Sequence, residues 1–317
     1  MTALSRPVNF MSIDVEDYFH VSAFEDISAP DTWGRRESRV ARNTEKVLEL
    51  LADAGVRGTF FTLGWVAEHH PGVVRAIAAQ GHEVACHGYW HQRMDRVSRE
   101  DFRQELLRCK GLLEDQSGQA ILGFRAPSYS VSPATLWMFD ELLAAGFRYD
   151  SSVFPIAHDF YGLSDWPDSP FWVQRQKDGC WAPGNPVSLG APLAVSATED
   201  RLLEVPIATL QLGGRRWPIA GGGYFRLYPY ALTRWGLQQL NGAGTPFVFY
   251  LHPWEFDPEQ PRMVGARLKS RFRHYLNLNR TAPRFRQLTR DFAFQPLAQA
   301  FAPGLAPACA TPAEQGE

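Results

Sequence analysis

Two histidines are spaced so that they could bind one cation. His87 and His91 lie four residues apart in the stretch HGYWH. This spacing places both imidazoles on the same side of one helical turn or of a tight loop, from which both can reach one metal ion. Ordinary half-buried histidines that only make hydrogen bonds are the competing interpretation. A carboxylate from elsewhere in the chain would favour a metal site.

Acidic residues that could supply this carboxylate end the first apolar run of the chain. Asp14, Glu16 and Asp17 stand in the stretch SIDVED. Because side chains alternate along a strand, Asp14 and Glu16 should point the same way, while Val15 packs into the interior. Two histidines and one carboxylate leave positions open for water on Zn²⁺ or a similar ion. We expect Glu16 to be the third ligand, with Asp17 as the alternative; a solvated loop is the competing interpretation.

Further polar residues could orient a carboxylate or move a proton. The guanidinium of Arg125 keeps its proton, so it would hold a nearby carboxylate ionised and fix its geometry, although an arginine that caps a loop is the alternative. His252 ends the apolar run 247–251. A proton donor fits this place, and a neighbouring acid such as Asp150 could raise its pKa. A buried histidine that is satisfied by the backbone is the competing interpretation.

The elements that must position these residues alternate between short apolar runs and helical patterns. The expected strands cover residues 8–13, 58–62, 83–86, 121–124, 147–149, 202–205 and 246–251. The expected helices cover residues 43–55, 71–81, 98–113, 132–146 and 230–240. This alternation is typical of a βα repeat with a largely parallel sheet or barrel. In such a barrel the carboxyl ends of the strands meet at one mouth, and the polar residues above fall repeatedly at those ends.

Composition excludes several classes of protein. The chain has 317 residues, 32 Lys+Arg against 34 Asp+Glu and a net charge of −2 at pH 7, which argues against a protein that coats nucleic acid. With 45% hydrophobic and 21% charged residues, it should fold. Its apolar runs are far shorter than the roughly 20 residues of a membrane-spanning helix, and we expect neither a signal peptide nor an anchor. Four cysteines without a CxxC pair favour a reducing, cytoplasmic setting.

The pattern predicts one main domain with two additions. We expect a barrel over residues 1–257, with an insertion at about 155–200 that is rich in Pro, Gly, Asp and Trp and has no sustained period. Residues 258–301 should form an extension packed on the barrel, and 302–317 a disordered tail. The stretch 262–290 is basic, and is either a solvated helical face or a contact for an anionic group.

In this order, the motifs resemble those of the NodB-homology polysaccharide deacetylases of carbohydrate esterase family 4. That family has a strand-end acid pair, HxxxH, RxPY, an Asp-x-x-x-Trp stretch and a Leu-x-His strand end. The corresponding stretches are SIDVED at 12–17, HGYWH at 87–91, RAP at 125–127, DSSVF at 150–154 and YLH at 250–252. The stretches DVEDYFH at 14–20, GGGYFR at 221–226 and HPWE at 252–255 further resemble the branch associated with exosortase-linked exopolysaccharide clusters. Ser128 intervenes before Tyr129, and Phe154 stands where the family usually has Trp.

The resemblance implies a distorted (β/α) barrel of the NodB-homology type and a metal-dependent hydrolase. The reaction would remove N-acetyl groups from amino sugars of an exopolysaccharide or its lipid-linked precursor. One divalent metal is implied, Zn²⁺ first and Co²⁺, Mn²⁺ or Ni²⁺ as alternatives, with the ligands Glu16, His87 and His91. Asp14 would be the general base, oriented by Arg125, and His252 the general acid, held as imidazolium by Asp150. A backbone N–H after Pro127 would assist the oxyanion.

Two alternatives remain open beside this function. A deformylase or another amidase would keep the barrel and change the amide. A catalytically inactive barrel would bind a glycan or a partner of a polysaccharide machine. The partner implied by the resemblance is an N-acetylated glycan or a lipid-linked oligosaccharide. We expect a cytoplasmic protein, with peripheral association with the inner membrane as a further option.

Overall fold

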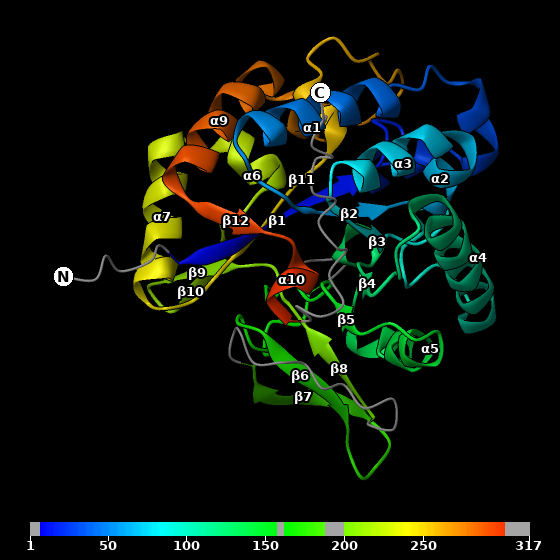
Figure 1. Cartoon of the computed structure of the whole chain (residues 1–317), viewed down its shortest axis with the longest axis vertical. Helices are drawn as coiled ribbons and strands as arrows, with labels where there is room; N and C mark the ends of the chain where they lie inside the picture. Colours follow the sequence, from blue (N-terminus) through cyan, green and yellow to red (C-terminus); the bar gives the residue numbers. More distant parts are fainter. Residues whose placement is uncertain (1–6, 157–161, 188–199, 302–317) are drawn as a thin grey trace, which may run out of the picture.

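The computed structural model describes residues 7–156, 162–187 and 200–301. Its strands are β1 (Val8–Val15), β2 (Thr59–Thr62), β3 (Glu83–Cys86), β4 (Gly123–Phe124), β5 (Tyr149–Asp150), β6 (Phe171–Arg175), β7 (Trp181–Pro186), β8 (Arg201–Glu204), β9 (Thr209–Leu212), β10 (Arg215–Pro218), β11 (Val248–Leu251) and β12 (Ala293–Gln295). The main sheet has the order β11-β1-β2-β3-β4-β5-β8-β6-β7, and β12 pairs with β1 (Figure 1). From β11 to β8 every strand pair is parallel.

Helices connect and cover the parallel strands. They are α1 (Val40–Asp53), α2 (Gly64–His69), α3 (Pro71–Ala79), α4 (Arg99–Ser117), α5 (Met138–Ala144), α6 (Gly222–Leu227), α7 (Tyr230–Gly242), α8 (Leu268–Tyr275), α9 (Thr281–Asp291) and α10 (Leu297–Phe301). The longest, α4, begins after Ser98, whose hydroxyl accepts the N–H of Asp101, and ends at Gly118 with a φ of 66°. A serine N-cap and a left-handed glycine are the usual ends of a helix.

Strand β1 lies between β11 and β2, one strand from an edge of the sheet, and carries Asp14 near its end. It is buried from Asn9 onward. Its residues Phe10 to Ile13 pair with β11, and Ser12 to Val15 pair with β2. β12 lies beside its first residues, where Val8 pairs with Ala293 (Figure 1). The end of β1 is therefore enclosed by neighbouring strands, and polar side chains there are held away from water.

The expected α/β class with a parallel sheet is confirmed. Within residues 155–200 the structure has strands that the sequence does not predict, whereas the assignment of the stretch as an insertion stays a prediction. The described part of that stretch contains an antiparallel hairpin of β6 and β7, which extends the sheet at the bottom of the view (Figure 1). Pro183 and Pro186 hid β7 in the sequence, since proline is tolerated on an edge strand. Residues 157–161 and 188–199 lie outside the described residues. No strand pair among the described residues joins β11 to β7, so hydrogen bonds do not close the barrel there.

A second hairpin, β9 and β10, was also missing from the sequence prediction. Gly213 and Gly214 form its two-residue turn, with φ angles of +58° and +74°. Positive φ at both positions is the requirement of the turn that matches the twist of paired strands. The hairpin packs beside α7, where a Cβ on Gly236 would meet Ile219 and Leu210.

Residues beyond the predicted barrel boundary at 257 contribute to the same core. Phe285 of α9 packs edge-on against Phe256, with 5.5 Å between the ring centroids, and β12 pairs with β1. The division of the chain into a barrel (1–257) and an extension (258–301) stays a prediction. The predicted tail, 302–317, lies outside the described residues. In the described part of the chain, no helix has the length and apolar character needed to cross a membrane.

Candidate active site

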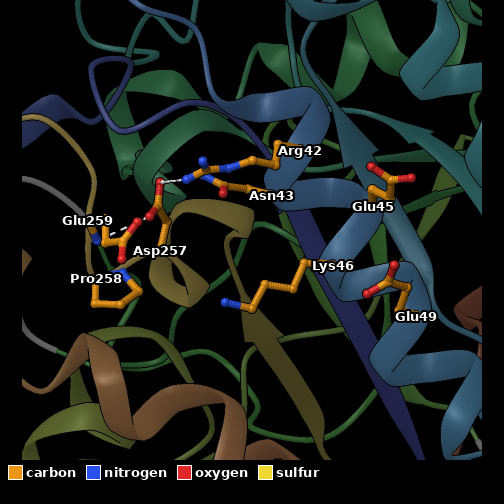
Figure 2. A pocket seen from close by; sticks show the side chains of 8 residues that line it. All are labelled: Arg42, Asn43, Glu45, Lys46, Glu49, Asp257, Pro258 and Glu259. Carbon is orange, nitrogen blue, oxygen red and sulfur yellow. Dashed lines mark hydrogen bonds and ion pairs between the residues drawn. The ribbon is translucent and has the colours of Figure 1, made fainter.

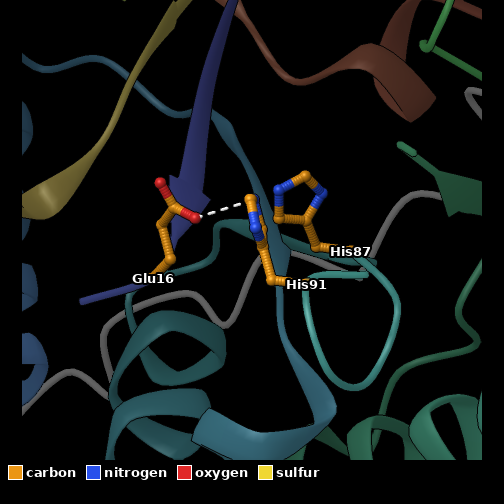
Figure 3. A group of neighbouring side chains, drawn as sticks. All are labelled: Glu16, His87 and His91. Atoms are coloured by element: carbon orange, nitrogen blue, oxygen red, sulfur yellow. Dashed lines mark ion pairs between the residues drawn. The ribbon is translucent and has the colours of Figure 1, made fainter. Parts of the chain in front are cut away.

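The structure brings the predicted metal ligands together. Glu16, His87 and His91 each offer one ligand atom, and these atoms lie within 4.8 Å of one another. Figure 3 shows Glu16 and His91 pointing toward each other with His87 beside them, and Nε2 of His91 lies 2.9 Å from Oε2 of Glu16. All three residues are buried. A carboxylate and two imidazoles are a ligand set that suits Zn²⁺ and related ions.

The two histidines come from a loop, which was one of the two geometries predicted for them. His87 directly follows β3, and Gly88 and His91 have φ angles of +75° and +51°. A positive φ is unusual for a residue with a side chain and is found where the surrounding structure imposes it. The left-handed conformation of His91 is thus part of the turn that brings the two imidazole rings together, with 5.4 Å between the ring centroids.

The protonation of His87 fits a metal ligand. Its Nδ1 lies 2.9 Å from the carbonyl oxygen of Arg125. A carbonyl only accepts, so Nδ1 carries the proton and Nε2 keeps its lone pair for a cation. Burial lowers the pKa of His87 to about 4, so the ring is neutral at physiological pH. These observations fit a resident divalent metal.

The carboxylate of Asp17 has a different environment from that of Glu16. Its Oδ2 accepts hydrogen bonds from the hydroxyl of Ser38 (2.8 Å) and from the N–H groups of Arg39 (2.7 Å) and Val40 (3.0 Å). Its Oδ1 accepts the N–H of Tyr18 (2.9 Å). Asp17 therefore satisfies the first N–H groups of α1. This long-range cap also explains why α1 begins at Val40, three residues before the predicted start.

Asp14 pairs with Arg125, as the sequence predicted. Nη1 of Arg125 donates to Oδ1 of Asp14 (2.6 Å) and to the hydroxyl of Ser12 (2.8 Å). The rest of the guanidinium donates to the carbonyl (3.1 Å) and hydroxyl (2.9 Å) of Ser151. Arg125 is fully buried, and such a bound guanidinium fixes the position of the Asp14 carboxylate.

A tyrosine that the sequence left without a role also reaches Asp14. The hydroxyl of Tyr129 donates to Oδ2 of Asp14 at 3.4 Å. Ser128 and Tyr129 have φ angles of +54° and +53°. The extra residue in this motif is thus accommodated in a left-handed turn that still points the ring to the site. The N–H groups of Tyr129 and Ser130 donate to carbonyls within this turn, so neither is the backbone donor predicted for an oxyanion.

His252 lies beside both acids, but its carboxylate partner is not the predicted one. Its Nε2 is 3.5 Å from Oε1 of Glu16 and 3.9 Å from Oδ2 of Asp14. Its Nδ1 is 2.8 Å from Oε1 of Glu255, which also accepts the backbone N–H of His252 at 3.1 Å. The prediction that Asp150 holds this ring is therefore corrected to Glu255. The physical reason is local, because the short 3-10 helix Pro253–Phe256 folds Glu255 back onto His252.

Glu255 is itself held by a buried arginine that sequence reasoning missed. Nε of Arg226 donates to Oε2 of Glu255 (2.6 Å), while its Nη1 donates to the carbonyls of His274 and Leu276 (both 2.8 Å). Burial alone would lower the pKa of His252, but the carboxylates of Glu16 and Glu255 raise it to about 9. The ring is therefore protonated at neutral pH. The only sequence signal for Arg226 is the GGGYFR stretch, which resembles a family motif but does not indicate a contact with Glu255.

Asp150 takes part in a separate buried carboxyl pair. It lies next to Glu204 on the neighbouring strands β5 and β8, and its Oδ1 accepts the hydroxyl of Ser152 (2.6 Å). Burial raises the pKa of Asp150 to about 6 and raises that of Glu204 well above its usual range. Two such carboxyls are stable as a pair that shares one proton. Ser152 in turn accepts the N–H of Ala126 (2.7 Å), so the pair supports the strand end that carries Arg125.

A surface hollow of about 430 Å³ lies away from these residues, between α1 and the residues after the helix Pro253–Phe256 (Figure 2). Arg42 donates to Asp257 (3.2 Å), and Lys46 donates to the carbonyl of Phe256 (2.7 Å). None of the predicted catalytic or ligand residues lines the hollow. Because these cations already have partners, we assign no ligand to it.

Comparisons with known proteins find relatives for both halves of the chain and for its fold. Residues 22–148 match the family model described as polysaccharide deacetylase, and residues 151–302 match one described as a domain of unknown function, DUF3473. The chain is 33% identical over 84 residues to a peptidoglycan-N-acetylglucosamine deacetylase of Bacillus cereus, a stretch that covers 26% of this chain and 30% of that protein. It is 34% identical over 85 residues to a chitooligosaccharide deacetylase of Sinorhizobium fredii, covering 26% and 40% respectively. The matched stretches thus span less than half of either relative.

A solved structure has the same fold over nearly the whole chain. It is described as a polysaccharide deacetylase from Mycobacterium smegmatis, and its TM-score is 0.55 at 17% identity, with coverage of 94% of this chain and 91% of that one. The comparisons thus show similarity to polysaccharide deacetylases over residues 22–148, and a shared fold over nearly the whole chain. This partial similarity agrees with the resemblance to the NodB-homology polysaccharide deacetylases that the sequence motifs carry.

Proposed function

We propose that the protein is a metal-dependent deacetylase that hydrolyses the N-acetyl groups of amino sugars in an exopolysaccharide or its lipid-linked precursor. One juxtaposition carries the proposal. Beside the Glu16, His87 and His91 group lie an arginine-held carboxylate, Asp14, and a carboxylate-held imidazolium, His252. Amide hydrolysis needs a base for water and an acid for the leaving amine on either side of a polarised carbonyl. The relatives named for N-acetylglucosamine and chitooligosaccharide substrates support the sugar.

The ligands Glu16, His87 and His91 would hold one divalent metal, Zn²⁺ in our proposal, with Co²⁺, Mn²⁺ or Ni²⁺ as alternatives. When bound, such an ion polarises the acetamide carbonyl and lowers the pKa of water. Asp14 accepts a proton from the attacking water, since the hydrogen bond from Arg125 holds its carboxylate in position. His252 gives a proton from Nε2 to the departing amine, and Glu255 keeps Nδ1 protonated so that Nε2 faces the reacting group.

The test is the product mass after incubation with an N-acetylated chitooligosaccharide, with the protein loaded with Zn²⁺. We expect the loss of one or more acetyl groups and the release of acetate, and neither with Asp14→Asn. The Glu45→Gln variant, which changes an exposed acid on α1, is the matched control and should act like wild type. If formate is released from an N-formylated sugar and no acetate is released from the acetylated one, the protein is a deformylase and the proposal is wrong. Binding of the sugar without either product would identify an inactive glycan-binding barrel.

The biological setting is also part of the proposal. The DVEDYFH, GGGYFR and HPWE stretches are the support for the exosortase-linked exopolysaccharide branch. The cysteine usage supports a reducing, cytoplasmic setting. Detection of the protein in a cytoplasmic fraction, and loss of the deacetylated polymer on deletion of its gene, are the corresponding tests.

A further inference from the structure

Large apolar side chains are exposed on one segment near the C-terminal end of the described chain. Val264, Leu268 and Phe272 have exposed fractions of 90%, 81% and 63%. Leu268 and Phe272 are four residues apart on α8, so they share one face of the helix, and Val264 lies at the preceding turn. The sequence offered a solvated basic face as one interpretation of this stretch. Three neighbouring exposed apolar side chains do not suit a surface that only meets water.

The same segment is strongly basic. Residues 262–290 contain nine Lys and Arg and no Asp or Glu, although the whole chain has a net charge of −2. On and beside α8 the exposed cations are Arg262, Arg267, Lys269, Arg271 and Arg273. Arg267 pairs with the exposed Asp26 (2.9 Å). In the described part of the chain, no carboxylate lies within ion-pair distance of Lys269, Arg271 or Arg273.

The opposite side of α8 is fixed to the protein, so these side chains cannot turn inward. His274 is buried, and its ring stacks on Trp254 with 4.1 Å between the ring centroids. Nε2 of His274 is 2.7 Å from Oε1 of Gln260. Trp254 in turn donates its indole N–H to Oε1 of Glu16 (3.1 Å). The outward surface of α8 is therefore a fixed feature that lies one aromatic layer away from the candidate active site.

We propose that this surface, defined by Val264, Leu268 and Phe272 with Lys269, Arg271 and Arg273, binds the headgroup region of an anionic lipid bilayer. Helices that lie in a membrane surface combine apolar side chains, which enter the headgroup and acyl boundary, with Lys and Arg, which attract anionic lipids. A second copy of the chain would bring like charges together across the contact. An acidic glycan would match the charge and leave the three apolar side chains in water. A bilayer accounts for both properties.

Membrane binding at α8 has a consequence for substrate delivery. The bilayer would hold the protein with the layer of Trp254 and His274 between the lipid surface and Glu16. A glycan carried on a lipid would thereby be concentrated near the candidate site. This consequence rests on the proposed function, whereas membrane binding itself does not.

The experiment is co-sedimentation of the full chain with vesicles of phosphatidylglycerol and phosphatidylcholine, compared with vesicles of phosphatidylcholine alone. We expect binding to the anionic vesicles only, and weaker binding at higher salt. Each cation near an anionic surface contributes about fivefold in affinity, so Arg271→Ala with Arg273→Ala should weaken binding about 25-fold. Leu268→Ser with Phe272→Ser should weaken it about tenfold or more. Matched controls are Arg75→Ala and Leu107→Ser, on exposed positions of α3 and α4, which should bind like wild type.

Several results would overturn the proposal. The first is binding of both double variants at the wild-type level, and the second is equal binding of the protein to both kinds of vesicle. The third is a protein that does not bind vesicles but forms a dimer that Phe272→Ser abolishes. Retention on an acidic polysaccharide without vesicle binding would do the same. Thermal unfolding confirms that each variant is folded, and both double variants should hydrolyse a soluble chitooligosaccharide at the wild-type rate. Because sedimentation does not depend on turnover, a failed deacetylase assay leaves this test intact.

Discussion

The neighbouring carboxylates Glu16 and Asp17 should separate metal binding from folding. Glu16 faces His91 and accepts the indole N–H of Trp254, whereas Asp17 accepts four hydrogen bonds, three of which come from residues at the start of α1. We predict that Glu16→Gln loses the metal and keeps the fold. Its amide oxygen can still accept from Trp254, but the anionic ligand is gone. Asp17→Asn should keep the metal and lower the stability of the fold.

The size of the folding defect follows from the hydrogen bonds of Asp17. An asparagine oxygen can still accept from Arg39 and Val40, but its NH₂ group would face the N–H of Tyr18, which loses its acceptor. Burial raises the pKa of Asp17 to about 6, so the carboxylate is charged at neutral pH at a desolvation cost that asparagine avoids. We therefore expect only the effect of one unsatisfied buried donor. The free energy of unfolding should fall by about 1–2 kcal/mol.

The assay is metal content per chain after dialysis against a buffered Zn²⁺ solution, together with thermal unfolding of the same samples. Asp17→Asn should retain the wild-type metal content, and its melting temperature should fall by about 2–6 °C. Glu16→Gln should bind Zn²⁺ at least about 100-fold more weakly, because even indirect partners of a metal site contribute 10–100-fold. If Asp17→Asn loses metal while Glu16→Gln keeps it, the assignment of Glu16 is wrong.

Three further outcomes follow from the site. Asp14→Asn should retain the metal and lose about 10²–10⁴-fold in turnover, and metal lost along with activity would make Asp14 a ligand. Glu255→Gln removes a charge that raises the pKa of His252, so the alkaline fall of the pH–rate profile should move to lower pH; amide substrates should slow more than activated esters, and equal slowing would refute the acid role of His252. The raised pKa values of Asp150 and Glu204 mean that their stabilisation is present below the unfolded pKa of about 4; it is lost as pH rises through about 6 for Asp150 and at higher pH for Glu204. Glu204→Gln should therefore unfold at higher denaturant concentration than wild type at pH 8, and not at pH 4.

The residues of the site that the sequence predicts, the acid pair and the histidine pair, follow from local patterns. Asp14 and Glu16 are two residues apart on a strand, and His87 and His91 are four apart, so each pair could be placed on one side from its spacing alone. The assignment of these pairs to strand ends required only the alternation of apolar runs and helical patterns. Those signals act over a few residues, and the structure follows them. The choice between Glu16 and Asp17 also needed the alternation of side chains along a strand.

The missed contacts involve residues that are distant in the sequence or lie in an irregular turn. Arg226 lies 29 positions before Glu255, and nothing in either local sequence identifies the other. The partner of His252 was assigned to Asp150 because both stand at strand ends, while Glu255 lies in a short turn after a proline. A glutamate three residues after the first position of a helical turn, with proline next to that position, is a signal for a side chain that folds back. That signal was present in HPWE.

The two matched segments of the chain contribute different parts of one candidate site. His87 and His91 lie within residues 22–148, His252 lies within 151–302, and Glu16 precedes both segments. The sheet explains how they meet, because β1, which ends next to Glu16, pairs with β2 on one side and β11 on the other. The segment that matches a domain of unknown function thus supplies the proposed general acid, its carboxylate partner and the basic surface of α8. A chain cut between the segments would keep the two histidines and lose the proton donor, so neither segment alone should hydrolyse an amide.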